Sequence, residues 1–156
     1  MRFILLDKVT ELVRGERITA VKTLSLAEEY LADHFPTFPV MPGVLMVEAL
    51  VQTAAMLVRV TQDFRHSMIV LEEARNVKYS SFVKPGMALT LEVEAKEIGE
   101  GRSIFKARGR VDGRSTVQAR LTLRHYNLAD ENPALEPVDK KLIEDMKRRA
   151  ELVGAA

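Results

Sequence analysis

The chain has 156 residues, of which 47% are hydrophobic and 29% charged, and its formal net charge is +1. This composition is ordinary for one soluble globular domain, and the small net charge argues against a general nucleic-acid binder. The sequence has no cysteine, which excludes disulfides and thiolate catalysis and fits a reducing compartment. The first residues, MRFILLDK, form too short an apolar run for a signal peptide, so we expect a cytoplasmic protein.

Two strands and a short helix are expected before residue 33. Residues 4–14 and 18–24 contain apolar side chains at intervals typical of half-buried strands, with a turn at Arg14-Gly15-Glu16 between them. Residues 26–32 are expected to be helical. Ser25 can cap this helix, and Glu28 lies three residues further on, the spacing of a capping box.

The segment 33–55, DHFPTFPVMPGVLMVEALVQTAA, dominates the sequence. Its three prolines predict a stiff loop, and residues 43–58 predict an apolar helix whose only ionisable side chain is Glu48. A helix that is apolar all round is buried, and carboxylates are rarely buried without a partner. Gln52 lies one helical turn after Glu48 and can hydrogen-bond to it. The carboxylate and the length of the run argue against a membrane span.

Residues 68–79 begin with the continuous apolar run Met68-Ile69-Val70-Leu71, which is typical of a strand covered on both faces. Three segments then alternate between apolar and polar residues: 89–95, 105–111 and 117–123. Asp112-Gly113 is a strong hairpin signal between the last two. These segments predict an antiparallel meander with one dry face, which the helix 43–58 must cover. The fold class is therefore α+β, a curved antiparallel sheet wrapped around one long buried helix.

The end of the chain differs in composition. We expect one domain over residues 1–126, followed by a polar linker and a C-terminal helix in residues 127–156. The spacing of Val138, Leu142, Met146 and Leu152 among many charges predicts an amphipathic surface helix over residues 138–153. Nothing in that helix indicates chemistry.

The three histidines carry different expectations. His66 lies in a polar loop and His125 at a strand end, and both are interpreted as structural. No histidine pair has the spacing of a metal site, so no metal is expected. His34 lies in the loop that leads into the helix of Glu48. It is either a packed loop residue or half of an acid/base pair.

The acid/base interpretation assigns a role to each polar group. His34 could accept a proton from carbon, and Glu48 could donate one to a leaving hydroxyl. Backbone N–H groups at the helix start, near Gly43 and Val44, could stabilise a developing oxyanion. Together these groups predict removal of a proton next to a thioester, with loss of a β-hydroxyl.

The run HFPTFPVMPGVLMVEALVQ resembles the signature of the bacterial 3-hydroxyacyl-ACP dehydratases of fatty-acid synthesis, the FabZ type with the hotdog fold. The resemblance extends over roughly residues 3–124, through FILLDKV, VKYSSFVKPG and VDG. It implies conversion of (3R)-3-hydroxyacyl-ACP to trans-2-enoyl-ACP, with His34 as base, Glu48 as acid and Gly43 in the oxyanion site. It also implies no metal or organic cofactor, acyl carrier protein as partner, and a homodimer, often a trimer of such dimers, in which His34 of one subunit meets Glu48 of the other.

The sequence departs from the family pattern at several positions. Asp33 and Thr37 stand where glycine is usual, and Glu72-Glu73 stand where the family has an apolar, tunnel-lining strand. Arg75, Lys78 and Lys84 are candidates for receiving an acidic carrier protein. Two alternatives stay open: a hotdog acyl thioesterase, and a non-catalytic acyl-binding or assembly subunit.

Overall fold

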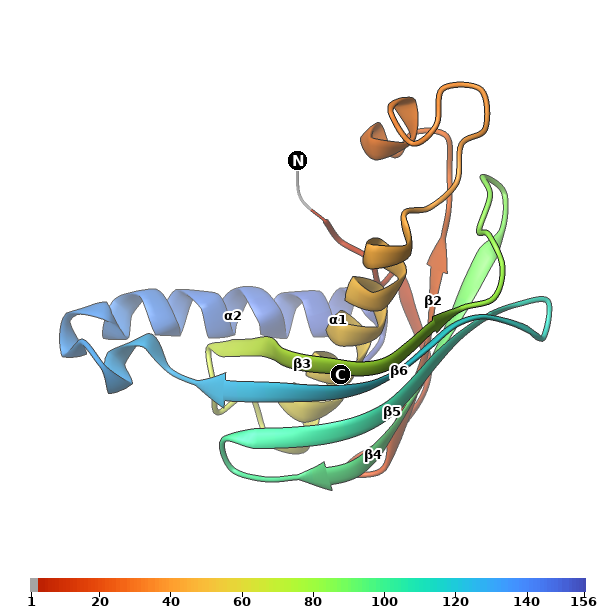
Figure 1. Cartoon of the computed structure of the whole chain (residues 1–156). Helices are drawn as coiled ribbons and strands as arrows, with labels where there is room; N and C mark the ends of the chain where they lie inside the picture. Colours follow the sequence, from red (N-terminus) through yellow and green to blue (C-terminus); the bar gives the residue numbers. More distant parts are fainter. Residues whose placement is uncertain (1–2) are drawn as a thin grey trace.

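Six antiparallel strands form one curved sheet, and a long helix, α1, lies against its concave face (Figure 1). The computed structural model describes residues 3–156. The strand order is β1-β2-β4-β5-β6-β3. The strands are β1 (Lys8–Val13), β2 (Arg17–Thr23), β3 (Met68–Tyr79), β4 (Ala88–Ile98), β5 (Arg102–Val111) and β6 (Arg114–Tyr126). The helices are α1 (Gly43–Thr61) and α2 (Glu136–Val153), with short 3-10 turns η1 (Glu29–Ala32), η2 (Leu128–Asp130) and η3 (Pro133–Leu135). The expected α+β hotdog architecture is confirmed.

The meander β4-β5-β6 follows the alternation of the sequence. Its inward side chains are buried against α1, among them Leu91, Phe105 and Leu121, each 0% exposed. The outward side chains are mostly charged and lie on the convex face. Asp112 and Gly113 both have positive φ, 49° and 75°, as a two-residue hairpin loop between right-twisted strands requires.

Helix α1 begins directly after Pro42 and ends at Thr61, three residues beyond the expected end. Its apolar residues fill the centre of the fold, with Ala49, Leu50, Ala54 and Leu57 fully buried. Within residues 3–156, α1 is also the one helix long and apolar enough to cross a membrane. However, 67% of its apolar stretch is buried inside the fold, as in the core helix of a folded domain.

Two expectations near the N-terminus are corrected. The first strand begins at Lys8 rather than at residue 4, because the backbone N–H of Leu5 donates to the side chain of Gln52 instead of to a strand. The expected helix over residues 26–32 is only the 3-10 turn η1, and no capping box forms. The hydroxyl of Ser25 accepts a hydrogen bond from Ala27, which closes a local turn that competes with a helix start.

Strand β3 was expected to be covered on both faces, and this is wrong. It lies at the edge of the sheet and pairs only with β6. Leu71 and Val77 are 40% and 38% exposed. A continuous apolar run does not distinguish a central strand from an edge strand whose apolar face is left open.

Helix α2 begins at Glu136, close to the expected position, but its buried face differs from the expected stripe. Val138 and Leu152 are 43% and 86% exposed, whereas Asp139, Ala150 and Val153 are buried. The helix is fixed at its start by Asp139, which accepts hydrogen bonds from the Ser67 hydroxyl and from two backbone amides of η2. The division of the chain at residue 126 stays a prediction.

Candidate active site

His34 is held by the loop that precedes α1. Its Nδ1 lies 2.9 Å from the carbonyl oxygen of Val40, and the N–H of Val40 donates back to the carbonyl of His34 at 3.0 Å. Because a carbonyl can only accept, Nδ1 carries the proton of the neutral ring, and Nε2 keeps a free electron pair. Phe35 stacks on the imidazole with ring centroids 4.2 Å apart. The loop therefore fixes both the tautomer and the direction of the ring.

The pocket around His34 has a volume of about 540 Å³ and is largely apolar. Besides His34 it is lined by Val40, Met41, Gly43, Val44, Met46, Tyr79, Ser80, Ser81 and Phe82. The size falls within the range of small-molecule sites, roughly 300–1,000 Å³.

The start of α1 contributes backbone groups to this pocket. The first helical hydrogen bonds are made by Leu45 and Met46, which both donate to the Pro42 carbonyl. The N–H groups of Gly43 and Val44 have no hydrogen-bond partner within the described part of the chain, and no side chain caps the helix. Two unsatisfied amides at the positive end of a helix dipole can bind a developing oxyanion.

Gly43 also lets an aromatic ring close over the helix start. A Cβ at this position would lie 2.8 Å from Cε1 of Tyr79, a distance that real contacts do not reach. Tyr79, at the end of β3, is 49% exposed and forms a wall of the pocket. Sequence reasoning missed Tyr79, because nothing in the sequence indicates that the end of β3 meets the start of α1.

Glu48 lies half-buried on α1 and is oriented by Gln52. The Gln52 side-chain oxygen accepts from the N–H of Leu5 at 2.9 Å, so its nitrogen must be the atom that faces Glu48. That nitrogen donates to the carbonyl of Phe3 at 2.9 Å and to Oε1 of Glu48 at 3.0 Å. The second carboxyl oxygen of Glu48 has no partner among residues 3–156.

The pocket on which Glu48 opens is separate from that of His34. Its volume is about 110 Å³, and its walls come from the N-terminal segment, α1, β3 and α2. The lining residues are Ile4, Leu6, Glu48, Val51, Gln52, Ala55, Met56, Arg59, Ile69, Met146 and Arg149. Within one chain the structure therefore brings His34 together with Gly43 and Val44, and Glu48 with Gln52, but the two groups line different pockets.

Arg59 and Arg149 were not among the expected site residues. Arg59 follows Glu48 and Gln52 at the helical spacing 48, 52, 55, 59, so the stripe itself could have indicated it. Arg149 comes from α2, and no pattern in the sequence predicts that this helix lies beside Glu48.

The residues that depart from the family pattern line neither pocket. Glu72 pairs with Arg102 at 2.8 Å and Glu73 with Arg75 at 2.8 Å, and neither acid lines the Glu48 pocket. Asp33 and Thr37 are exposed. In residues 3–156 no group of three or more histidine and carboxylate side chains lies close enough to hold a metal.

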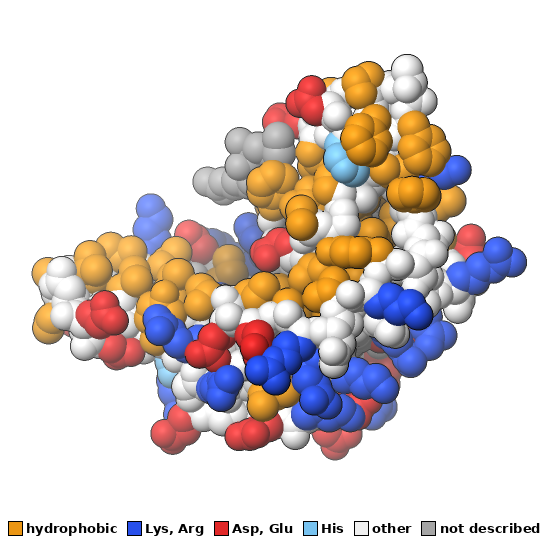
Figure 2. All heavy atoms as spheres, viewed as in Figure 1, with side chains coloured by type: hydrophobic (Ala, Val, Ile, Leu, Met, Phe, Trp, Pro, Cys, Tyr) orange, Lys and Arg blue, Asp and Glu red, His pale blue; other side chains and the backbone are white. Residues whose placement is uncertain are grey.

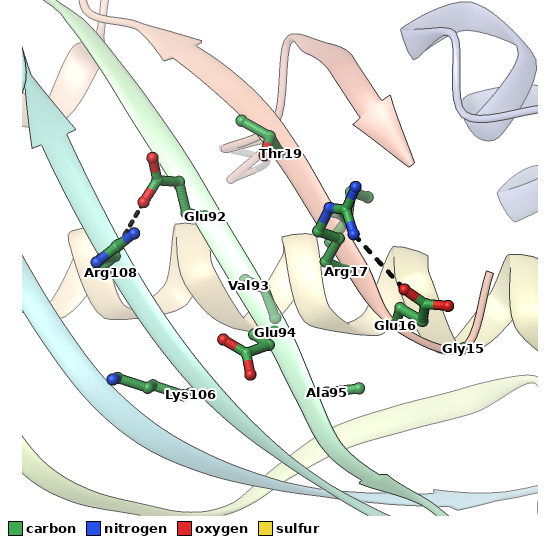
Figure 3. A pocket seen from close by; sticks show the side chains of 11 residues that line it. Gly15, Glu16, Arg17, Thr19, Glu92, Val93, Glu94, Ala95, Lys106 and Arg108 are labelled. Atoms are coloured by element: carbon green, nitrogen blue, oxygen red, sulfur yellow. Dashed lines mark hydrogen bonds and ion pairs between the residues drawn. The ribbon is translucent and has the colours of Figure 1, made fainter. Parts of the chain in front are cut away.

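A third hollow, of about 530 Å³, lies on the convex face of the sheet (Figure 3). Four of its charged side chains form pairs within the hollow: Arg108 with Glu92, and Arg17 with Glu16 at 3.5 Å. Hydrophobic side chains gather instead over α2 and over the arm of the molecule that carries the loop before α1 (Figure 2). The exposed apolar residues nearest to His34 are Phe35, Phe38, Val44, Tyr79 and Phe82.

The fold and this arrangement define a hotdog-fold protein with a histidine pocket and a carboxyl pocket. The family model that matches the sequence is the FabA-like domain, over residues 1–120. A relative named "3-hydroxyacyl-[acyl-carrier-protein] dehydratase FabZ" from Ruminiclostridium cellulolyticum is 39% identical, covering 76% of this chain and 84% of the relative. A relative of the same name from Thiobacillus denitrificans is 43% identical, covering 78% and 88%. The chain belongs to the FabA-like family.

Solved structures support the fold. The dehydratase heterocomplex ApeI:P from Xenorhabdus doucetiae aligns with a TM-score of 0.72 at 16% identity, covering 86% of this chain and 90% of that chain. A hypothetical thioesterase with coenzyme A from Streptococcus pneumoniae aligns with a TM-score of 0.55 at 14% identity, covering 76% and 84%. At such identities the likeness concerns the fold alone.

Proposed function

We propose that this protein is a hydro-lyase that converts (3R)-3-hydroxyacyl-ACP to trans-2-enoyl-ACP in fatty-acid or related lipid synthesis. The observation that carries the proposal is the free Nε2 of His34 in one pocket with the unpartnered amides of Gly43 and Val44. Relatives at 39% and 43% identity that bear the name of this dehydratase support the substrate class.

The proposed reaction uses each group once. Nε2 of His34 removes a proton from C2 of the acyl group, and the N–H groups of Gly43 and Val44 stabilise the negative charge that develops on the thioester oxygen. Glu48 acts as the acid and donates a proton to the C3 hydroxyl. The C3–O bond then breaks, the C2–C3 double bond forms and water leaves. A proton passes from His34 to Glu48 through solvent to restore the starting state.

The reaction requires both pockets at one substrate, and we propose that a second copy of the chain joins them. His34 of one subunit would face Glu48 of the other. Three features support a homodimer: the two groups line different pockets of one chain, β3 is an open edge strand, and apolar side chains lie exposed around His34. A trimer of such dimers and a cytoplasmic location stay predictions.

Carrier-protein docking is proposed for the basic residues near the His34 pocket. Lys84 lies 5.2 Å from the ring centroid of Phe38, which itself packs edge-on against the pocket residue Phe82. Arg75 is engaged by Glu73, so Lys84 and Lys78 are the stronger candidates. Replacing these lysines should weaken turnover of carrier-bound substrate and its dependence on salt, while turnover of a small thioester stays unchanged.

The two alternatives predict different results. In a thioesterase, Glu48 would direct water at the thioester, and His34→Ala would leave substantial hydrolysis. A non-catalytic acyl-binding subunit would show no turnover as a purified homo-oligomer. The fixed tautomer of His34 favours the dehydratase, because only that reaction requires a base at C2.

The test is hydration of crotonyl thioester, followed as loss of enoyl absorbance, with wild type, His34→Ala and Glu48→Gln. We expect activity in wild type and a loss of roughly 100-fold or more in each variant, the usual contribution of a general acid or base. Inactivity of wild type toward short and long enoyl chains, on both carrier protein and coenzyme A, would overturn the proposal.

A further inference from the structure

The Glu48 pocket ends at two arginines. Glu48, Gln52, Ala55 and Arg59 follow one another on one face of α1, and all four line the pocket. The eleven-residue step from Glu48 to Arg59 corresponds to about 16 Å along the helix axis. The pocket is thus bounded by the reacting carboxyl at one end and a guanidinium at the other.

The wall between these ends is apolar. Ile4 and Leu6 come from the N-terminal segment, Ile69 from β3 and Met146 from α2. The cavity is small, about 110 Å³. Such a space suits a short hydrocarbon segment whose far end reaches Arg59 and Arg149.

Within residues 3–156 the two arginines have no counter-charge. Arg59 is only 9% exposed, and its Nη1 donates to the carbonyls of His66 at 3.1 Å and Ser67 at 3.5 Å. Its Nε and Nη2 donate to no group in residues 3–156. No carboxylate of this part of the chain lies within 4.0 Å of either guanidinium. Burial, and then the nearby charge of Arg149, lower the pKa of Arg59 to about 10.

We infer that this pocket selects acyl groups that end in a carboxylate, which Arg59 and Arg149 bind at the far end from Glu48. A buried guanidinium with unused donors is stabilised by an anion that accepts two parallel hydrogen bonds, a geometry that carboxylates match. A methyl-ended chain would instead leave the buried charge of Arg59 uncompensated beside an apolar wall, with only the half-exposed Arg149 in contact with solvent. The inference rests on the proposed function, since it concerns the substrate of that reaction.

The experiment compares trans-2-enoyl thioesters of matched length that end in a carboxylate, a methyl ester or a methyl group. For wild type we expect kcat/KM to be about tenfold or more higher with the carboxylate than with either neutral end, as a charge-assisted hydrogen bond would give. The methyl ester is similar in size to the carboxylate but uncharged, so it shows whether a preference for the carboxylate is due to its charge or to its size. The preference should weaken at high salt.

Variants of Arg149 test the site. Arg149→Gln should remove most of the carboxylate preference, and Arg149→Lys should keep part of it. Lys147→Gln is the matched control, because it removes one positive charge from the exposed side of the same helix. Arg59→Gln is a second test, to be interpreted only if its thermal unfolding matches that of wild type.

The outcomes distinguish this inference from the proposed function. Equal or better turnover of methyl-ended chains, or a preference that survives Arg149→Gln, overturns the inference while the dehydratase stands. If wild type hydrates crotonyl thioester but no carboxylate-ended chain, the inference is likewise overturned. Inactivity toward every enoyl thioester overturns both.

Discussion

The side-chain nitrogen of Gln52 donates a 3.0 Å hydrogen bond to Oε1 of Glu48. The same nitrogen donates to the carbonyl of Phe3, and the oxygen accepts from Leu5. Gln52 is therefore clamped by the N-terminal segment and cannot turn its oxygen toward Glu48. One carboxyl oxygen of Glu48 is therefore held by Gln52, while the residue itself lines the pocket.

Gln52→Ala should lower kcat by up to about 100-fold with little change in KM. The carboxyl group of Glu48 would no longer be held in the position that proton transfer requires, whereas substrate binding would not change. Steady-state kinetics on crotonyl thioester measure this, with the pH profile recorded for both proteins. Gln62→Ala is the control, since Gln62 donates to Gly99 beyond the end of α1 and lines neither pocket. An unchanged kcat in Gln52→Ala would show that Gln52 does not position the acid.

Much of this geometry was predictable from the sequence because it is local. The spacing of Glu48 and Gln52 predicts their contact, and Asp112-Gly113 predicts the hairpin. Relations between distant segments were not predictable. The apolar run Met68–Leu71 is compatible both with a central strand and with an edge strand, so it does not predict which of the two β3 is. The contact of Arg149 with the Glu48 pocket depends on how α2 docks, which is decided by the buried Asp139 rather than by an apolar stripe.

A mixture of His34→Ala and Glu48→Gln proteins should regain activity if the active site joins two subunits. After the two inactive variants are unfolded together and refolded, half of the dimers combine one of each, and one of their two sites has both native residues. The expected activity is about a quarter of the wild-type value. Each variant refolded alone is the control and should stay inactive. A mixture no more active than its components would place both residues in one chain.

Gly43→Ala should raise KM with only a small loss of stability. The added Cβ meets the ring of Tyr79, which is exposed enough to swing aside and thereby reshapes the His34 pocket. Adding Tyr79→Ala removes the clash, so the double variant should behave as Tyr79→Ala alone in a double-mutant cycle. Kinetics and thermal unfolding of the four proteins measure this. Fully additive effects would contradict the contact.

The protein should lose stability as the pH falls below 6.5, through His66 and His125. Their rings lie 5.6 Å apart. Burial, and then the charge of Arg65, lower the pKa of His66 below the ordinary 6.5, and the charge of Asp130 opposes this only in part. Burial likewise lowers the pKa of His125, against the hydrogen bond to the Glu100 carbonyl, which raises it. Because each ring binds a proton less readily in the fold than in the unfolded chain, the unfolded chain binds more protons below pH 6.5, so the free energy of unfolding decreases there.

Chemical denaturation at pH 8, where both rings are neutral in the folded and in the unfolded protein, gives the reference value of the free energy of unfolding. A series of measurements down to pH 5 gives the slope of this free energy against pH. His125→Gln should flatten the slope, since its ring is 3% exposed and its Nε2 has no partner among residues 3–156. An equally steep slope in His125→Gln and in His66→Gln would assign the acid sensitivity to other groups.

Asp139→Asn should loosen α2 and lower the Tm by about 5 °C or more. Burial raises the pKa of Asp139, but hydrogen bonds from Ser67, Ala129 and Leu128 outweigh it and hold the pKa below the ordinary 3.8. The carboxylate is thus charged throughout the range in which the histidines titrate. Asparagine offers one acceptor oxygen in place of two, so a buried amide or the hydroxyl loses its partner.

Thermal unfolding and hydrogen exchange along α2 measure the effect. Asp145→Asn on the same helix is the control, because Asp145 pairs only with Arg148 at the surface and its loss should change the Tm by no more than about 2 °C. Since α2 carries Arg149 to the Glu48 pocket, Asp139→Asn should also reduce the preference for carboxylate-ended substrates. Faster exchange in α2 without any change in that preference would mean that the end bearing Arg149 is held independently, by the buried Ala150 and Val153.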